Sequence, residues 1–341
     1  VATKGFCREN GIPFEECGKL LVATNEREER AMDALEERAQ LNQIAVERLD
    51  AHALRQAEPG ITGRGALLVR STGIVDYKHI CRVMCAKLRE LGADIRFASS
   101  VTSIKETSTS VTLLSGELQF QASRLVVCAG LQSDRIAAMA GLKLEHRIIP
   151  FRGEYYGLPA ARNDLIRHLI YPIPDPDLPF LGVHLTKMID GSITVGPNAV
   201  LGLSREGYGR GTVSLRDLGA TLAFPGFWRL VRKHWRTSIE EARDSLWKRG
   251  YLERCKKFCP SLTLGDLQPY PAGIRAQAVG RDGTLVHDFL FRQTDRMLHV
   301  INAPSPAATA AIPIGRMIAD RLVGHRPHRT GNIGELNPAS V

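Results

Sequence analysis

Hydrophobic positions along the first hundred residues follow helical and strand periods in turn. Residues 25–50 are rich in Glu, Arg, Ala and Leu, a pattern that predicts one or two amphipathic helices with charged outer faces. Residues 65–70 form a short apolar run that predicts a strand. Asp76 is a suitable N-cap for a helix whose apolar positions continue at helical spacing to Leu91, and residues 94–98 then predict a strand. This helix–strand step is the repeating unit of a parallel sheet.

Short strands dominate the next part of the pattern. Residues 101–106, 111–114 and 117–121 predict a small antiparallel meander. Residues 125–128 are continuously apolar, so we expect a strand buried on both faces, and a helix follows at 133–140.

A second region begins near residue 150 and mixes strands with helices. Residues 171–179 contain four prolines and predict a stiff non-helical loop. The other predicted elements are strands at 154–158, 181–185, 192–195, 273–279, 284–286 and 298–302, helices within 215–251, and a final helix at 306–323.

These elements predict an α/β (α+β) fold, and a length of 341 residues is consistent with two domains. We expect one domain to be assembled from both ends of the chain, residues 1–145 and 280–324. A mostly antiparallel β-domain, residues 146–279, is inserted between them, and residues 325–341 read as a loose tail.

The net charge of the chain indicates which classes of ligand or partner it favours. The chain has 45 Lys and Arg against 36 Asp and Glu, a net charge of +9, which favours anionic partners. The basic residues are scattered and not interleaved with aromatics, so we expect no nucleic acid and favour an anionic cofactor or substrate. Most of these charges are also explained as a solvated surface. The charge permits peripheral contact with an acidic membrane, although no amphipathic anchor stands out.

Cysteine usage indicates a reducing compartment. The seven cysteines have no disulfide-framework spacing, so we expect a cytoplasmic protein, including the inner face of a membrane, or a mitochondrial one in a eukaryote. Cys81 and Cys85, like Cys255 and Cys259, are one helical turn apart. Zinc sites more often use two-residue spacing and nearby histidines, so we expect thiols and no metal.

The stretch from Asn302 to Ala311 carries the most specific chemical signal, and no Walker loop, HExxH or GxSxG motif is present. It follows a predicted strand and opens a helix, with Ser305 as the expected cap and Pro306 at the first helical position. The alanine run leaves the helix N-terminus free of bulk, which suits an anionic group. A tight helix–strand contact is the alternative reading. Pro313 is expected to kink or restart the helix.

Three polar side chains are further candidates for chemistry. His184 lies in an apolar strand and is read either as a satisfied core histidine or as a base at a pocket wall. Arg152 and Arg275 lie among small residues. Each could form a structural salt bridge, and the two together would suit a dicarboxylate.

Taken together, these stretches resemble one family along about residues 2–324. The chain is similar to the L-2-hydroxyglutarate oxidases and dehydrogenases, flavoproteins of the D-amino-acid-oxidase-like superfamily. The motifs that carry the resemblance, in order, are Cys17-Gly-Lys-Leu, Thr72-Gly-Ile-Val-Asp-Tyr, Cys128-Ala-Gly-Leu, Ser133-Asp-Arg-Ile, Pro150-Phe-Arg-Gly-Glu, Tyr171-Pro-Ile-Pro-Asp, Pro179-Phe-Leu-Gly-Val-His, Gly196-Pro-Asn-Ala, Arg205-Glu-Gly-Tyr, Pro271-Ala-Gly-Ile-Arg-Ala-Gln and Asn302-Ala-Pro-Ser-Pro-Ala-Ala-Thr.

The resemblance implies FAD as cofactor, an FAD-binding Rossmann-like domain and oxidation of L-2-hydroxyglutarate to 2-oxoglutarate. It implies that electrons pass to oxygen, a quinone or an electron-transfer protein. By similarity His184 would be the base, and Arg152, Tyr171 and Arg275 would bind the substrate. The residues expected at the cofactor are Val101, Ala129, Gly130, Ser305, Pro306, Ala307, Ala308 and Thr309.

One part of the family pattern does not occur in this sequence. The superfamily begins with a strand, a GxGxxG turn and a helix, and residues 1–341 contain no such segment. Because the first residue is Val, we expect a processed chain or a piece of a longer one. We therefore expect weak FAD binding or an open sheet edge beside residues 125–129. The alternatives are another enzyme of the superfamily, oxidising an amine or glycerol phosphate, and a non-catalytic remnant.

Overall fold

A nine-stranded, mostly antiparallel sheet carries most of the core. The computed structural model describes residues 2–174, 182–209, 211–233 and 248–324. Among the described strands of this sheet, only β11 and β2 pair in parallel. The strand order is β14 (Val200–Leu201), β10 (His146–Gly157), β13 (Ile193–Gly196), β12 (His184–Lys187), β11 (Leu169–Pro172), β2 (Lys19–Ala23), β4 (Gly65–Val69) and β3 (Glu47–Asp50), with β15 (Gln268–Gly280) also paired to β10.

The sheet has two chemically different faces because successive side chains of a strand point to opposite sides. Leu20, Ile170 and Leu185 come from neighbouring strands and are fully buried in the largest hydrophobic cluster. Helices α3 (Ala51–Ala57) and α9 (Lys248–Lys256) contribute to that cluster. The residues beside these core positions therefore project from the opposite face.

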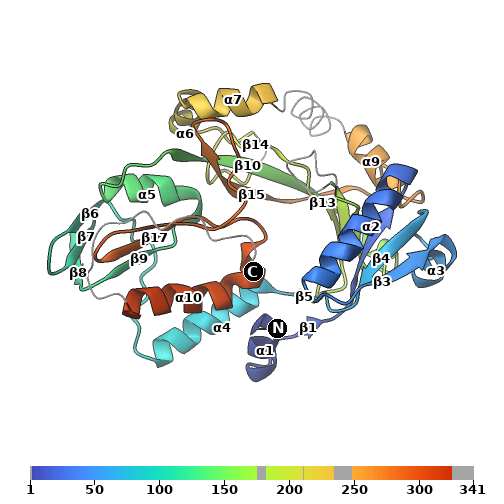
Figure 1. Ribbon diagram of the computed structural model, residues 1–341, viewed down its shortest axis with the longest axis horizontal. Helices are drawn as coiled ribbons and strands as arrows, with labels where there is room; N and C mark the ends of the chain where they lie inside the picture. The colour runs from blue at the N-terminus through green and yellow to red at the C-terminus, as the bar shows by residue number, and fades with distance from the viewer. Residues whose placement is uncertain (1, 175–181, 210, 234–247, 325–341) are drawn as a thin grey trace.

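Two smaller sheets lie at the other end of the molecule (Figure 1). One has the order β16 (Leu290–Gln293), β17 (Met297–Asn302) and β9 (Leu125–Val127), and β17 and β9 are parallel. The other is the antiparallel meander β6 (Ser103–Glu106), β7 (Val111–Ser115) and β8 (Leu118–Ala122). A separate antiparallel pair is formed by β1 (Phe14–Glu15) and β5 (Ile74–Val75). Among the described residues β17 is the one strand paired with β9, so the second edge of β9 has no strand on it.

Helices surround both ends of the molecule. Helices α4, α5 and α10 lie with the smaller sheets, whereas α6 and α7 lie over β10, β14 and β15 (Figure 1). No helix in the described ranges is long and apolar enough to cross a membrane. The remaining bounds are α1 (Ala2–Glu9), α2 (Glu26–Leu41), α4 (Tyr77–Glu90), α5 (Ser133–Met139), α6 (Leu215–Leu222), α7 (Pro225–Lys233) and α10 (Ala311–Gly324).

Several elements predicted from the pattern are confirmed. Helix α2 begins after Asn25, whose side chain accepts a hydrogen bond from the backbone N–H of Glu28, and α4 is capped by Asp76 in the same way. The meander, α5 and the mixed α/β class are also as predicted.

Other elements differ from the prediction. Residues 47–50 form β3, not helix, because they pair with β4. Residues 94–98 form no strand; they are mostly exposed, and no described strand pairs with them. Strand β9 is only partly buried, with Val127 as its one buried residue, so the expected burial on both faces is wrong. Residues 171–172 belong to β11, not to a loop, while 175–179 lie outside the described residues.

Hydrogen bonding joins segments that the predicted domain division separates. Strands β2, β3 and β4 come from residues 1–145, yet they share a sheet with strands of residues 146–279. The assignment of domain limits stays a prediction, and the predicted loose tail, residues 325–341, lies outside the described residues.

A buried ion pair connects α5 to the large sheet. The guanidinium of Arg205 donates to both carboxylate oxygens of Asp134 at 2.5 and 2.9 Å, and it also donates to the carbonyls of Leu131 and Ile148. Asp134 in turn accepts from the backbone N–H of Ile148 at 3.0 Å. The Arg205 side chain is 3% exposed, so both charges depend on these partners.

We expect Arg205→Met to lower the free energy of unfolding by about 3–5 kcal/mol, because it leaves the Asp134 carboxylate buried without its cation. Urea denaturation measures this change. Arg281→Met is the matched control, since Arg281 pairs with Glu145 at the exposed surface, and it should cost less than about 1 kcal/mol. Equal losses in the two variants would contradict a special role for the buried pair.

Candidate active site

Polar side chains from five strands gather on the face of the large sheet opposite its main core. Each strand that sends an apolar residue into the core presents the neighbouring residue on the other face. Lys19 precedes the core residue Leu20, His184 precedes Leu185, and Tyr155 precedes Tyr156. The polar set on this face is Lys19 of β2, Tyr171 of β11, His184 and Thr186 of β12, Tyr155 of β10 and Arg275 of β15.

The rings of Tyr171 and His184 stack at the centre of this set. Their centroids are 4.0 Å apart and their planes differ by 9°. The hydroxyl of Thr186 lies 3.1 Å from His184 Nδ1, so that nitrogen has a hydrogen-bond partner, and no partner is found for Nε2 among the described residues. Burial, together with the charges of Lys19 and Arg275, lowers the pKa of His184 to about 4. The imidazole is therefore neutral at physiological pH, as a general base must be.

Two cations act on this histidine. Lys19 Nζ lies over the ring of Tyr171, 5.6 Å from its centroid, and burial lowers the pKa of Lys19. Burial also lowers the pKa of Arg275, while the nearby Tyr155 opposes that effect. Lys19 and Arg275 place two partly buried positive charges on this face, and positive charge there suits an anionic ligand.

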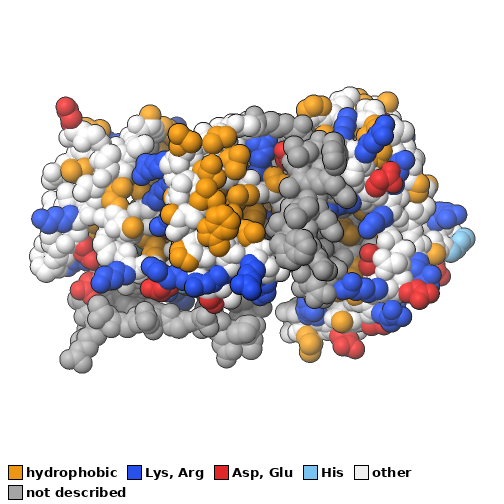
Figure 2. Space-filling view, turned by 90° about the horizontal axis from the view of Figure 1, so that it is seen from above, with side chains coloured by type: hydrophobic (Ala, Val, Ile, Leu, Met, Phe, Trp, Pro, Cys, Tyr) orange, Lys and Arg blue, Asp and Glu red, His pale blue; other side chains and the backbone are white. Residues whose placement is uncertain are grey.

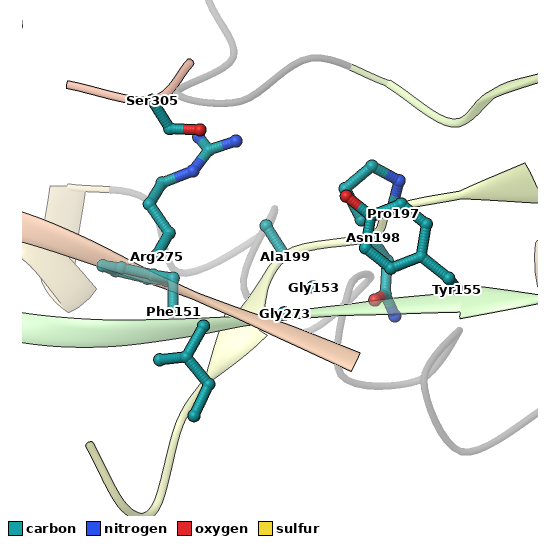
Figure 3. A pocket seen from close by; sticks show the side chains of 10 residues that line it. Phe151, Gly153, Tyr155, Pro197, Asn198, Ala199, Gly273, Arg275 and Ser305 are labelled. Carbon is teal, nitrogen blue, oxygen red and sulfur yellow. The ribbon is translucent and has the colours of Figure 1, made fainter. Parts of the chain in front are cut away.

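A cavity of about 140 Å³ opens between the middle of β15 and the 197–199 loop (Figure 3). The side chain of Arg275 extends across it toward Ser305, and Tyr155 lies on the opposite side. The lining residues are Phe151, Gly153, Tyr155, Pro197, Asn198, Ala199, Gly273, Ile274, Arg275 and Ser305. The cavity therefore brings Arg275, predicted for substrate, beside Ser305, predicted for the cofactor.

Arg152 does not join this set. It is the sequence neighbour of Phe151, which pairs with Arg275, so Arg152 projects from the other face of β10. Its Nε lies 3.5 Å from Glu154 Oε1, and it also donates to the carbonyl of Gly209. The structure thus places Arg152 in an ion pair of its own strand, and substrate binding by this residue stays an untested prediction.

Small exposed residues occupy the positions that resemblance assigns to FAD. Ser305, Pro306, Ala308 and Thr309 are exposed between β17 and α10, and a Cβ on Gly130 would meet open space. These features leave room for a flat ligand against the backbone, so the residues present fit the cofactor. Ala129 follows β9, and Val101 packs beside the cluster of Ile104.

The start of this helix differs from the prediction. A 3₁₀ turn spans Ala307–Ala310, the α-helix begins at Ala311, and no side chain caps the turn at Pro306. Pro313 consequently lies in the first turn of α10, where its missing N–H breaks no helical hydrogen bond. The expected cap by Ser305 is therefore wrong, whereas the start of the α-helix at Ala311, after a separate 3₁₀ turn, agrees with the expected restart near Pro313.

Sequence reasoning missed Lys19, Tyr155 and Thr186. Lys19 stands in the Cys17-Gly-Lys-Leu motif, but its strand meets β11, about 150 residues later, only in the folded chain. The sequence held a usable signal for the other two. His184 and Thr186 are two apart in a strand and therefore share a face, and Tyr155 is the neighbour of a core tyrosine and therefore projects from the opposite face.

Comparison with known proteins places the chain among flavoenzymes. Residues 2–321 match the family model DAO, described as FAD dependent oxidoreductase. The L-2-hydroxyglutarate dehydrogenase of Escherichia coli (strain K12) is 48% identical over 322 residues, covering 94% of this chain and 76% of the relative. The L-2-hydroxyglutarate dehydrogenase of Indibacter alkaliphilus is 39% identical over 317 residues, covering 92% and 79%.

Solved structures agree on the fold. An L-alpha-glycerophosphate oxidase from Mycoplasma pneumoniae with FAD bound superposes with a TM-score of 0.72 at 19% identity, covering 94% of this chain and 76% of that one. A glycine oxidase from Geobacillus kaustophilus gives a TM-score of 0.69 at 17% identity, covering 95% and 76%. Identities this low support the fold and no particular substrate.

The charge of Lys19 is expected to influence the pKa of His184 measurably. Lys19→Met should raise the pKa of His184 from about 4 by about half a unit, because it removes one positive charge while burial persists. NMR titration of the imidazole measures this shift. Lys187→Met is the control, since Lys187 already pairs with Glu15 at 2.7 Å. An unchanged pKa in Lys19→Met would show that its charge does not reach the histidine.

Proposed function

The chain belongs to the DAO family of FAD-dependent oxidoreductases, and on that premise we propose that it oxidises L-2-hydroxyglutarate to 2-oxoglutarate. The observation that carries the substrate is that two partly buried cations, Lys19 and Arg275, both help to lower the pKa of the neutral His184. A dicarboxylate would supply one negative charge for each cation. Curated relatives that are 48% and 39% identical carry this substrate in their names.

The residues of the site divide into two roles. Arg275, with five N–H donors, would hold the carboxylate beside the reacting carbon, next to Ser305 on the cofactor side of the cavity. Lys19 would hold the distal carboxylate, and Tyr171 would fix the ring of His184 by stacking. His184 Nε2 would then accept the hydroxyl proton, because Thr186 occupies Nδ1.

Bound FAD supplies the acceptor for the hydride that leaves C2 of the substrate. We propose that Val101, Ala129, Gly130 and residues 305–309 would hold it, on the fit of their exposed small side chains. The enzyme passes its electrons on, and oxygen, a quinone and an electron-transfer protein are the candidates. A quinone lies in a membrane and would require the peripheral contact that the basic charge permits.

A non-catalytic remnant is disfavoured by this arrangement, because a histidine whose pKa is strongly lowered beside two cations is typical of functional sites. Amine or glycerol phosphate oxidation remains the enzymatic alternative, and it fits two cations less well than a dicarboxylate does.

Replacing the proposed base gives the first test. His184→Gln should reduce kcat with L-2-hydroxyglutarate by about 10²–10⁴-fold, while flavin content per chain changes little. A dye-linked assay with added FAD measures turnover, and absorbance of the purified protein measures flavin. Turnover equal to that of the unaltered enzyme would refute the role of His184.

Comparing two substrates tests the role of Lys19. Lys19→Met should lower kcat/KM for L-2-hydroxyglutarate by about 10–100-fold, because a charge-assisted hydrogen bond to the distal carboxylate is lost. For L-2-hydroxybutyrate, which lacks that carboxylate, the change should stay below about 3-fold. Lys187→Met is again the control. Equal losses on both substrates would contradict the assignment, and no activity of the unaltered enzyme on L-2-hydroxyglutarate would refute the substrate itself.

A further inference from the structure

The side chain of Asn302 joins two sheets beside the proposed active site. On the face of the molecule in Figure 2, charged side chains are spread over the outer surface. Asn302, the last residue of β17, is in contrast only 2% exposed. Buried amides are found where their N–H donors and their oxygen have partners, so the contacts of Asn302 indicate what it holds.

Both N–H donors and the oxygen of this amide are bonded to backbone groups. Oδ1 accepts from the N–H of Ala278 in β15 at 3.1 Å. Nδ2 donates to the carbonyl of Asp288 at 2.8 Å and to that of Val286 at 3.2 Å. Val286 is itself tied to β15, because its N–H donates to the carbonyl of Ala278 at 3.0 Å. Asn302 therefore has no N–H donor left for a ligand, and its partners are segments of the chain.

The bond to Ala278 connects two strands that no ladder connects. β15 pairs with β10 of the nine-stranded sheet, whereas β17 belongs to a three-stranded sheet, and the two do not pair within the described ranges. The side chain of Asn302 thus carries a hydrogen bond from one sheet to the other. Its removal would leave the N–H of Ala278 without this acceptor and would loosen the two strands against each other.

These two strands carry the two halves of the proposed site. Arg275 lies three residues before Ala278 on β15, and Ser305 lies three residues after Asn302. Both line the same cavity, and the arginine side chain extends toward the serine (Figure 3). The arginine belongs to the proposed substrate set and the serine to the residues proposed to hold FAD. Asn302 therefore fixes the part of the chain that would hold the substrate against the part that would hold the cofactor.

We propose that Asn302 is a positioning residue for hydride transfer, which sets the distance between C2 of the substrate and the flavin. This inference rests on the proposed function and deepens it. Reacting atoms must lie about 3–3.5 Å apart, and a misplacement of about 1 Å can cost about 10²-fold in rate. The bond between the strands therefore matters more for the rate of transfer than for the binding of either ligand.

Anaerobic stopped-flow measurements on the full chain with saturating FAD test the proposal. Asn302→Ala should lower the rate constant of flavin reduction by L-2-hydroxyglutarate about 10²-fold per bound flavin. The Kd for 2-oxoglutarate, measured by calorimetry, should change less than about 3-fold, because Lys19 and Arg275 are retained. Asn302→Ser keeps a hydroxyl that can accept from Ala278 and should lose about tenfold, so it decides the question if Asn302→Ala does not fold.

Hydrogen exchange gives a measurement that does not depend on turnover. In protein without FAD, Asn302→Ala should speed the exchange of the Ala278 amide by about tenfold or more, because its acceptor is lost. Glu106→Ala is the matched control. Glu106 Oε1 accepts from Thr294 Oγ1 at 2.8 Å and from the N–H of Arg296 at 2.6 Å, and so ties down the other end of β17. This control should lower the melting temperature, yet change flavin reduction less than about 3-fold and leave the exchange of Ala278 as it is.

Three results would overturn the positioning role while the proposed function stands. They are unchanged flavin reduction in Asn302→Ala, equal losses in Asn302→Ala and Glu106→Ala, and unchanged exchange at Ala278. Equal losses would mean that general loosening of β17 explains the effect. Absence of flavin reduction by L-2-hydroxyglutarate in the unaltered protein would instead refute the proposed substrate, and this inference with it.

Discussion

The alternation of side chains across the nine-stranded sheet is the constraint on which both the core and the site depend. Each strand sends apolar side chains from one face into the core and polar side chains from the other face into the site. A shift of one residue in strand register would exchange the two sets of side chains. Leu20 and Leu185 enter the core, so Lys19 and His184 must project from the other side. The core thus fixes the position of the charges without touching them, because its packing sets the register of the strands.

Local sequence patterns predicted many of the helices and strands, but they did not predict which strands pair with one another. Caps at Asn25 and Asp76 are short-range signals, and both helices form where expected. Residues 47–50 become a strand only because β4 lies beside them, which no local pattern shows. The same limit hid Lys19, whose partner strand is remote in sequence, and it placed Arg152 with Arg275 although the register separates them. Family membership, in contrast, followed from ordered motifs and needed no register.

Some residues of the family motifs have a structural role. Asp134 and Arg205 belong to two separate motifs of the resemblance, and in the fold they form one buried ion pair that joins α5 to β10.

The electrostatics of the site tie substrate binding to proton transfer. Without ligand, burial and two cations hold the pKa of His184 at about 4, which keeps the ring neutral but makes it a weak base. A dicarboxylate bound to Lys19 and Arg275 would cancel their positive potential, so the pKa of His184 would rise toward its ordinary value. A monocarboxylate would cancel only part of it. The charge of the correct substrate would therefore strengthen the base that acts on it, and selectivity would appear in kcat as well as in binding.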